Sequence, residues 1–221
     1  MAGPALVVFD CDGVLVDSEP LSMRVLLQTI EAKGVTLDLA TAYARFLGRS
    51  LASICRDLGE TDGITLDEAD LEDLRRRLYA TFRAELRPTS GIHEAIAGLD
   101  RPFCVASSSQ PERIELSLRT TGLWTYFEGR AFSATMVARG KPAPDLFEHA
   151  ARAMGHGPEH CVVVEDSPAG LLAAEAAGMR TVAYVGASHA KSPTHRSALE
   201  RLAPDIVLDD MRRLPEILKR L

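Results

Sequence analysis

Basic charge and long apolar runs are both scarce in this sequence. Its 31 aspartate and glutamate residues outnumber its 25 lysine and arginine residues, which gives a formal net charge of -6. Such a chain has no broad basic field for a nucleic-acid backbone or an anionic membrane surface. Its strongest apolar runs, at 5–9 and 161–165, are far shorter than the roughly 18 residues of a membrane span. We therefore expect a cytoplasmic protein that binds neither nucleic acid nor membrane.

Cysteine is also scarce, and its spacing excludes a disulfide framework or a zinc site. The four cysteines, Cys11, Cys55, Cys104 and Cys161, lie far apart, and no pair has the spacing of a disulfide scaffold or metal motif. Cys104 and Cys161 fall in strand-like runs, so we interpret them as buried small apolar side chains. The six histidines show no metal-ligand spacing either, and we expect them at surface or capping positions.

The rest of the composition is that of a globular protein with a pattern typical of a parallel sheet. Hydrophobic residues make up 46% and charged residues 25% of the chain. In the C-terminal half, short β-branched runs alternate with helix-like segments, as in sheets covered by helices on both faces. One such helix has Ser167 as its N-cap, Pro168 at its first position and Gly178 beyond its end. The runs predicted to form strands lie at 5–9, 103–106, 161–164, 181–185 and 205–208.

The segment from 19 to 87 holds no convincing strand. Its periodicity predicts consecutive helices near 20–33, 39–47, 51–58 and 67–86, separated at Gly34, at Gly48, and at Gly59 together with Asp62-Gly63. A long helical segment between the first and second strands indicates an insertion. We therefore predict an α/β fold with a Rossmann-like parallel sheet core flanked by helices (1–16 and 88–221) and an inserted all-α helical-bundle cap domain (17–87).

Polar residues follow the predicted strands at the points where they end. Ligands of open parallel sheets bind beyond the carboxyl ends of the strands, so we expect these residues to meet at one edge. They are Asp10 and Asp12 after the first run, Ser107 to Ser109 after the second, and Glu165 and Asp166 after the third, with Lys141 between the last two groups.

Clustered carboxylates repel one another unless a cation lies among them. Oxygen ligands without histidine or cysteine favour Mg²⁺ or Ca²⁺ over zinc, and Mg²⁺ suits a site that also binds phosphate. Phosphoryl transfer is then the leading chemistry. Asp10 would be the nucleophile, Asp12 the general acid and base, and Ser107 and Lys141 the groups that bind the phosphoryl oxygens.

Each motif has a plainer interpretation when taken alone. Asp10 and Asp12 could form an aspartate-rich turn, the three serines an ordinary loop, and Glu165 with Asp166 the cap of the following helix. Lys141 could be a surface lysine, although 21 of the 25 basic residues are arginine. The combination of the motifs, in this order, favours a catalytic site over these separate interpretations.

The motifs FDCDGVLVDSE, VASSS, GKPAPD and VVVEDSPAG resemble those of the haloacid dehalogenase-like superfamily, in particular its β-phosphoglucomutase-like phosphatases with a helical cap. The resemblance covers nearly the whole chain. It implies that Asp10 is phosphorylated, that Asp12 is the acid and base, and that Ser107 and Lys141 serve the phosphoryl group. It also implies that the cap closes over the site.

The same resemblance implies ligands for the metal and the substrate. Magnesium would be held by Asp10, the backbone oxygen of Asp12, Glu165 and Asp166. The FLGRS stretch matches the family's cap loop and offers Arg49 and Ser50 to the substrate, in addition to Ser107, Ser108 and Lys141 in the core. The resemblance also offers Arg75, in the RRRLY stretch, as the counterpart of a cap cation of the mutase, but for Arg75 to Arg77 we favour a solvated helix face.

We interpret the chain as a monomeric, magnesium-dependent phosphatase that acts on a small phosphorylated metabolite, either a sugar phosphate or a phosphorylated sugar acid. Dehalogenases lack the aspartate that is present here as Asp12. A hexose-phosphate mutase is an alternative, but Ser22 stands where the mutase has histidine. A receiver domain phosphorylated on aspartate is an alternative from another class, against which the inserted helices argue. A non-catalytic anion-binding module would leave Asp12 and Lys141 without a role.

Overall fold

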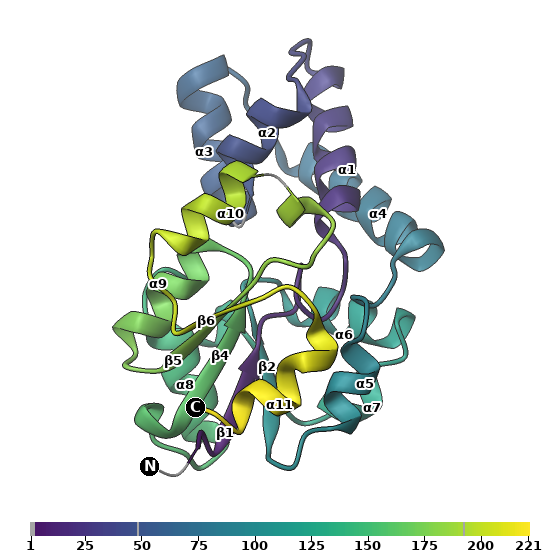
Figure 1. The fold of residues 1–221 in the computed structure, drawn as a ribbon. Helices are drawn as coiled ribbons and strands as arrows, with labels where there is room; N and C mark the ends of the chain where they lie inside the picture. Colours follow the sequence, from purple (N-terminus) through teal and green to yellow (C-terminus); the bar gives the residue numbers. More distant parts are fainter. Residues whose placement is uncertain (1–2, 48, 192) are drawn as a thin grey trace.

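A six-stranded parallel sheet forms the centre of the computed structural model, which describes residues 3–47, 49–191 and 193–221 (Figure 1). The strand order is β3-β2-β1-β4-β5-β6, and every neighbouring pair is parallel. The Rossmann-like α/β fold predicted from the sequence is confirmed. The strands are β1 (Leu6–Phe9), β2 (Phe103–Ser107), β3 (Ala131–Ser133), β4 (Cys161–Glu165), β5 (Arg180–Tyr184) and β6 (Ile206–Leu208).

Both faces of the central strands β1 and β4 are buried, which explains why these strands are apolar without alternation. In β1, Val7 and Phe9 belong to one hydrophobic cluster, and Leu6 and Val8 belong to a second cluster. The second cluster includes α8 and α9, whereas the first continues into the helices inserted after β1. Cys104 and Cys161 are fully buried in the second cluster, as expected.

Short helices connect the strands and cover the sheet. Between β2 and β4 the chain forms α6 and α8, and α9 follows β4. The N-terminus of α9 is the predicted one, because Ser167 Oγ accepts a hydrogen bond from Gly170 N at 3.1 Å and Pro168 follows it. The helices outside the insertion are α5 (Ile92–Ala97), α6 (Pro111–Thr120), α7 (Trp124–Phe127), α8 (Asp145–Ala153), α9 (Pro168–Ala176), α10 (Pro193–Glu200) and α11 (Leu214–Leu218), with 3-10 turns η1 (Ala134–Met136), η2 (Pro158–His160), η3 (His189–Lys191) and η4 (Met211–Arg213).

In the described part of the chain five helices lie between β1 and β2, and the first four stand beyond the carboxyl ends of the strands, at the top of Figure 1. The chain leaves and re-enters the sheet at one place, because Asp17 N donates to Arg87 O and Thr89 N donates to Leu15 O, each at 3.0 Å. The predicted domain boundaries lie at this pair of connections, and the division into two domains stays a prediction. The first four helices are α1 (Glu19–Ala32), α2 (Leu39–Phe46), α3 (Leu51–Asp62) and α4 (Glu68–Glu85).

Two details differ from the sequence-based expectation. The helix expected over 51–58 continues past Gly59 to Asp62, and it ends at Gly63, the second of the two predicted breaks, whose φ of 67° is the left-handed conformation that suits glycine at a helix end. The strand β3 was not predicted, because its three residues AFS form no β-branched run. Gly48, expected to separate two helices, lies outside the described residues.

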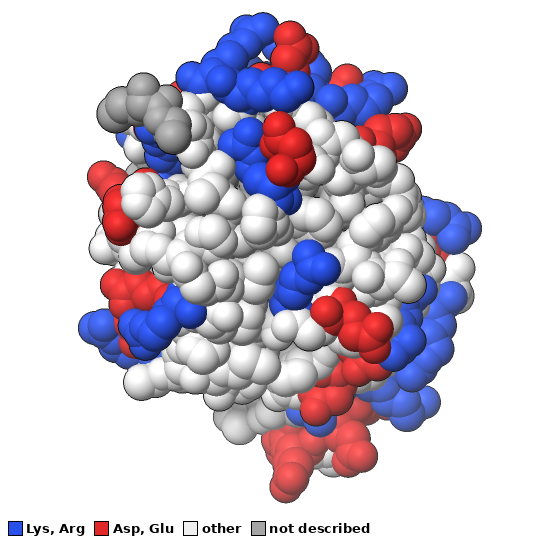
Figure 2. Space-filling model, turned by 90° about the horizontal axis from the view of Figure 1, so that it is seen from below, with Lys and Arg blue, Asp and Glu red and all other residues white. Residues whose placement is uncertain are grey.

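The face opposite the inserted helices carries charges of both signs, scattered over a largely uncharged surface (Figure 2). It therefore presents no continuous basic field of the kind that binds nucleic acid. No helix among the described residues is long and apolar enough to span a membrane.

Packing of the inserted helices can be tested with two leucines. Leu58 of α3 is fully buried, whereas Leu39 of α2 is 54% exposed. We expect Leu58→Ala to lower the free energy of unfolding by about 2–5 kcal/mol, since it leaves a cavity, and Leu39→Ala to change it by less than about 0.5 kcal/mol. Urea unfolding followed by circular dichroism measures both, and equal effects would contradict the packing described here.

Candidate active site

The ends of three neighbouring strands bring the predicted residues together. Phe9 pairs with Val105 of β2 and with Val164 of β4, and Asp10 N donates to Val164 O at 3.0 Å. The residues that follow these pairs in their strands are Ala106 and Glu165. Asp10 is therefore placed at the edge where Glu165 and Ser107 also end their strands.

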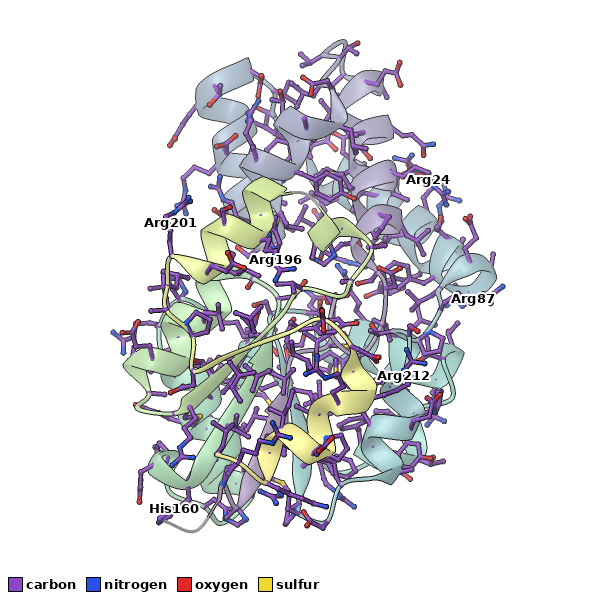
Figure 3. The ribbon with its side chains drawn as sticks, viewed as in Figure 1. Arg24, Arg87, His160, Arg196, Arg201 and Arg212 are labelled. Carbon is purple, nitrogen blue, oxygen red and sulfur yellow. The ribbon has the colours of Figure 1, made fainter. Side chains whose placement is uncertain are left out.

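The side chain of Lys141 lies between two of the carboxylates. Its Nζ donates to Asp10 Oδ1 at 2.7 Å, to Glu165 Oε1 at 2.8 Å and to the backbone oxygen of Ala106 at 3.1 Å. The side chain is 4% exposed, whereas Arg24 and Arg201 extend outward at the edge of the molecule (Figure 3). Lys141 is thus a buried ammonium with all three of its donors engaged.

Opposing effects set the charge of this group. Burial disfavours the ammonium, but Asp10 and Glu165 outweigh burial and raise the pKa of Lys141. Burial also raises the pKa of Asp10 well above its usual value; Lys141 opposes this shift, while Glu165 and Asp166 add to it. The pKa of Asp166 is also raised, mainly by burial and to a smaller extent by the negative charge of Glu165. The site therefore holds more negative charge than one ammonium offsets.

Asp12 points away from this cluster and is fixed by three side chains. Its Oδ1 accepts from Ser18 Oγ at 2.6 Å and from Arg113 Nη2 at 2.8 Å, and its Oδ2 accepts from Ser109 Oγ at 2.6 Å. Burial opposes ionisation of Asp12, but Arg113 and the two hydroxyls outweigh burial and lower the pKa of Asp12. Asp10 and Asp12, two residues apart, therefore have pKa values shifted in opposite directions.

Two glycines allow the carboxylates to lie close to the backbone. A Cβ atom on Gly170 would lie 1.8 Å from Glu165 Oε1, and one on Gly13 would lie 1.9 Å from Asp166 Oδ2. Glu165 can therefore fold back, so that its Oε2 accepts from the backbone nitrogens of Asp166 and Ser167 at 2.8 and 2.7 Å. This second role of Glu165 is to fix the start of α9.

A metal ion fits the carboxylate cluster. Asp10, Glu165 and Asp166 are buried, and one carboxylate oxygen from each lies within 4.8 Å of the others. These are hard oxygen donors without histidine or cysteine, which suits Mg²⁺. The side chain of Asp12 is engaged elsewhere, and a contribution of its backbone oxygen to a metal ion stays a prediction.

A cavity of about 460 Å³ opens between the strand ends and the inserted helices. Its floor includes Asp10, Asp12 and Lys141, and its walls include apolar residues of α1, α3 and α4. All five predicted substrate residues line it, namely Ser107, Ser108, Lys141, Arg49 and Ser50.

The two predicted cap residues have other partners as well. Arg49 donates to Ser53 Oγ, at 2.7 Å from Nη2, and to Asp57 Oδ2, at 3.1 Å from Nη1. Ser50 Oγ accepts from Ser53 N at 3.3 Å and caps α3. Both side chains therefore stabilise the local structure of the cap, and contact with a substrate stays a prediction for them.

Several residues of the site were not predicted. Ser18 and Glu19 lie within the first motif, but the spacing that singled out Asp10 and Asp12 says nothing about them. Arg113 comes from α6, and no local pattern distinguishes it from other helix arginines. Arg75 is exposed, as expected for a solvated helix face, but it also lines the cavity. Arg76 is exposed and pairs with Asp73, whereas Arg77 is partly buried and donates to Thr29 Oγ1 at 2.6 Å as well as to Asp73.

His189 also corrects the expectation of surface histidines. Its side chain is fully buried, and its Nε2 lies 2.8 Å from Asp166 Oδ2, without the alignment of a hydrogen bond. His195 Nε2 lies 2.8 Å from the backbone oxygen of Asp166. The sequence gave no sign of either contact, because both depend on how the segment after β5 crosses the strand ends.

Comparison with known proteins agrees with this arrangement. Residues 4–178 match the profile of the haloacid dehalogenase-like hydrolases. The chain is 33% identical over 190 residues to 6-phosphogluconate phosphatase of Escherichia coli K12, and this alignment covers 86% of each chain. It is 32% identical to fructose-1-phosphate phosphatase of the same organism, which covers 80% of this chain and 94% of the relative.

A solved structure shares the fold over nearly its full length. The haloacid dehalogenase-like protein of unknown function from Agrobacterium tumefaciens strain C58 has a TM-score of 0.86 and 33% identity, and the match covers 98% of both chains.

The surplus of negative charge predicts a stability that depends on magnesium. The pKa of Asp166 is higher in the folded protein than the usual 3.8, so the folded state binds this proton more tightly than the unfolded chain does. The stability contributed by Asp166 is therefore lost as pH rises from about 4 through the folded pKa. At pH 7 we expect Asp166→Asn to raise the Tm of the metal-free protein, by about 2–4 °C for each kcal/mol of repulsion that the substitution removes. We also expect it to reduce the further rise in Tm that Mg²⁺ causes in the wild type.

Thermal unfolding with and without Mg²⁺ measures both effects. Asp145→Asn is the matched control, because Asp145 pairs with Arg139 outside the cluster and its pKa is lowered instead. A variant Asp166→Asn that melts below the wild type without metal, while keeping its full response to Mg²⁺, would contradict this charge balance.

Proposed function

The chain belongs to the haloacid dehalogenase-like hydrolase family, and from this premise we propose that it is a magnesium-dependent phosphatase that hydrolyses a phosphorylated sugar or sugar acid through an aspartyl-phosphate. The observation that supports this most strongly is the buried contact of Lys141 with Asp10 and Glu165 on the floor of a cavity lined by the inserted helices. A surface turn or a plain anion-binding loop would have no use for such an arrangement.

Asp10 is the proposed nucleophile. Lys141 holds its Oδ1, so we expect Oδ2 to attack phosphorus while the bond from phosphorus to the ester oxygen breaks. Lys141 and Ser107 would stabilise the charge on the transferred phosphoryl group, and the closed cavity would exclude water from this first step. Magnesium, bound by Asp10, Asp166, the backbone oxygen of Asp12 and Glu165, would add positive charge at the phosphoryl oxygens.

Asp12 is the proposed general acid and base. In the first half of the reaction it gives a proton to the departing ester oxygen, and in the second half it removes a proton from the water that attacks the aspartyl-phosphate. Inorganic phosphate then leaves, and Asp12 carries the proton needed for the next cycle. The lowered pKa of Asp12 suits the second half, in which it must begin ionised.

The cavity and the relatives support a sugar-sized substrate. The walls combine apolar side chains of the cap with Arg49, Arg75 and Tyr79. Among the described residues, Arg75 has no hydrogen bond or ion pair, whereas Arg49 is held by Asp57. We propose that Arg75 pairs with a second anionic group of the substrate, such as the carboxylate of a sugar acid.

A hexose-phosphate mutase remains the second candidate. It would use the same aspartates but return the phosphoryl group to the sugar. Ser22, at the position of the mutase histidine, accepts a hydrogen bond from Arg113 at 3.2 Å and brings no imidazole to the site. This difference favours hydrolysis, and the receiver-domain alternative does not account for the cavity beneath the cap.

The nucleophile can be tested by removing its charge. We expect Asp10→Asn to lower kcat for a panel of sugar phosphates by at least about 10³-fold, since the amide cannot form the acyl-phosphate, and to leave the fold intact because the volume is unchanged. Release of inorganic phosphate with and without Mg²⁺ measures this. Near-normal turnover by Asp10→Asn would refute the assignment of the nucleophile. Isomerisation of a hexose phosphate by the wild type, without release of phosphate, would favour the mutase.

The proposed anion subsite is tested by Arg75→Gln. We expect KM for 6-phosphogluconate to rise by about 10-fold, the effect of one lost charge-assisted hydrogen bond, and KM for a neutral sugar phosphate to rise less. Arg76→Gln is the control, because Arg76 is exposed and pairs with Asp73. Equal effects of the two substitutions would contradict a role for Arg75 in the subsite.

A further inference from the structure

Glu19 is an acidic residue of the cavity for which the reaction described above has no use. It is the first residue of α1 and is partly buried where it lines the cavity. Glu19, Ser22, Met23 and Leu26 all line the cavity, and their spacing places them on one face of the helix. This face is polar at its start, beside the catalytic loop, and apolar one turn later.

Glu19 differs from the other acidic residues of the cavity because it has no partner in the part of the chain that the structure describes. Lys141 donates to Asp10 and Glu165, Arg113 donates to Asp12, and His189 contacts Asp166. Among the described residues, no hydrogen bond or ion pair reaches the carboxyl group of Glu19. A carboxylate that loses water without gaining a donor is destabilising, so a donor supplied by a ligand would compensate for this loss.

The surroundings of Glu19 indicate which kind of donor that is. Burial raises the pKa of Glu19 to about 7, and the charges of Asp12 and Asp166 add to the shift more than His189 and Arg113 reduce it. A second anionic group of the substrate would be repelled at this place. The metal cluster of Asp10, Glu165 and Asp166 does not include Glu19. Neutral hydroxyl groups can donate to the carboxyl oxygens without adding negative charge.

We propose that Glu19 binds hydroxyl groups on the carbons next to the phosphoester, and that it thereby selects polyhydroxylated substrates over simple alkyl phosphates. This assignment rests on the proposed phosphatase activity and extends it to the part of the substrate that is recognised. Two oxygens of one carboxylate can accept from two neighbouring hydroxyls, a geometry that a sugar phosphate supplies. Arg75 would then bind the distal end of the substrate, and Glu19 would bind the hydroxyl groups nearest the phosphorus.

Two phosphate esters that differ only in hydroxyl groups test the assignment. Glycerol 3-phosphate carries two hydroxyls that n-propyl phosphate lacks. We expect the wild type to hydrolyse glycerol 3-phosphate with a kcat/KM about 10–100-fold above that for n-propyl phosphate, the range for hydrogen bonds to a charged group. Glu19→Ala should reduce this ratio toward one, and Glu19→Gln, which keeps one acceptor oxygen, should retain part of it.

Glu31→Ala is the matched control, because Glu31 lies on the same helix but is exposed and does not line the cavity. It should keep the wild-type ratio. A ratio near one in the wild type, or an unchanged ratio in Glu19→Ala, would overturn the assignment, as would a preference for phosphoethanolamine over glycerol 3-phosphate. Failure of the wild type to release phosphate from any ester, p-nitrophenyl phosphate included, would instead refute the proposed phosphatase function.

Discussion

The site depends on one interaction, the buried ammonium of Lys141 between Asp10 and Glu165. Three carboxylates gather at the ends of β1 and β4, and their mutual repulsion would drive them apart or protonate them in the absence of positive charge. Lys141 offsets part of this charge and holds one oxygen of Asp10, which leaves the other oxygen for chemistry. The remaining negative charge is what a divalent cation would complete.

The fold brings this interaction about by joining distant parts of the chain. The register of β1 with β2 and β4 fixes Asp10 beside Ala106 and Glu165, and the backbone oxygen of Ala106 accepts the third hydrogen bond of Lys141. Gly13 and Gly170 make room for the carboxylates. Burying such a group of charges costs stability, and the apolar contacts of both sheet faces and of the inserted helices provide the compensating stabilisation.

The sequence predicted the parts of this arrangement that follow from local patterns. Apolar runs located five of the six strands, and the polar residues after them included the carboxylates and Lys141, because parallel strands end at a common edge. The short strand β3 carries no such pattern. Arg113, Glu19 and His189 could not be assigned from spacing, because their places depend on how α6, α1 and the segment after β5 pack around the cavity. The same reason explains why Arg75 lines the cavity although the three consecutive arginines gave no sign of it.

Two carboxyl groups near the strand ends of the cavity differ in their surroundings. Asp12 and Glu19 are both carboxyl groups of one cavity, near the strand ends. The pKa of Asp12 is lowered from its usual value, whereas the pKa of Glu19 is raised. Arg113 and two hydroxyls donate to Asp12 and stabilise its charge, whereas no side chain in the described part of the chain donates to Glu19, and the attraction of His189 and Arg113 does not offset its burial. In the proposed reaction, the group that exchanges protons is therefore separate from the group that accepts hydrogen bonds from the substrate.

The central claim is that Asp10 becomes covalently phosphorylated while Lys141 holds its carboxylate. Acid quenching of Asp12→Asn during turnover of p-nitrophenyl phosphate, followed by tandem mass spectrometry, tests it most directly, because this ester needs little help from a general acid and the variant hydrolyses the intermediate slowly. The account predicts one phosphoryl group on Asp10, and none on any residue when Lys141 is also replaced by Met. A phosphoryl group on another residue, or phosphate release with no labelled Asp10 at any time, would contradict it.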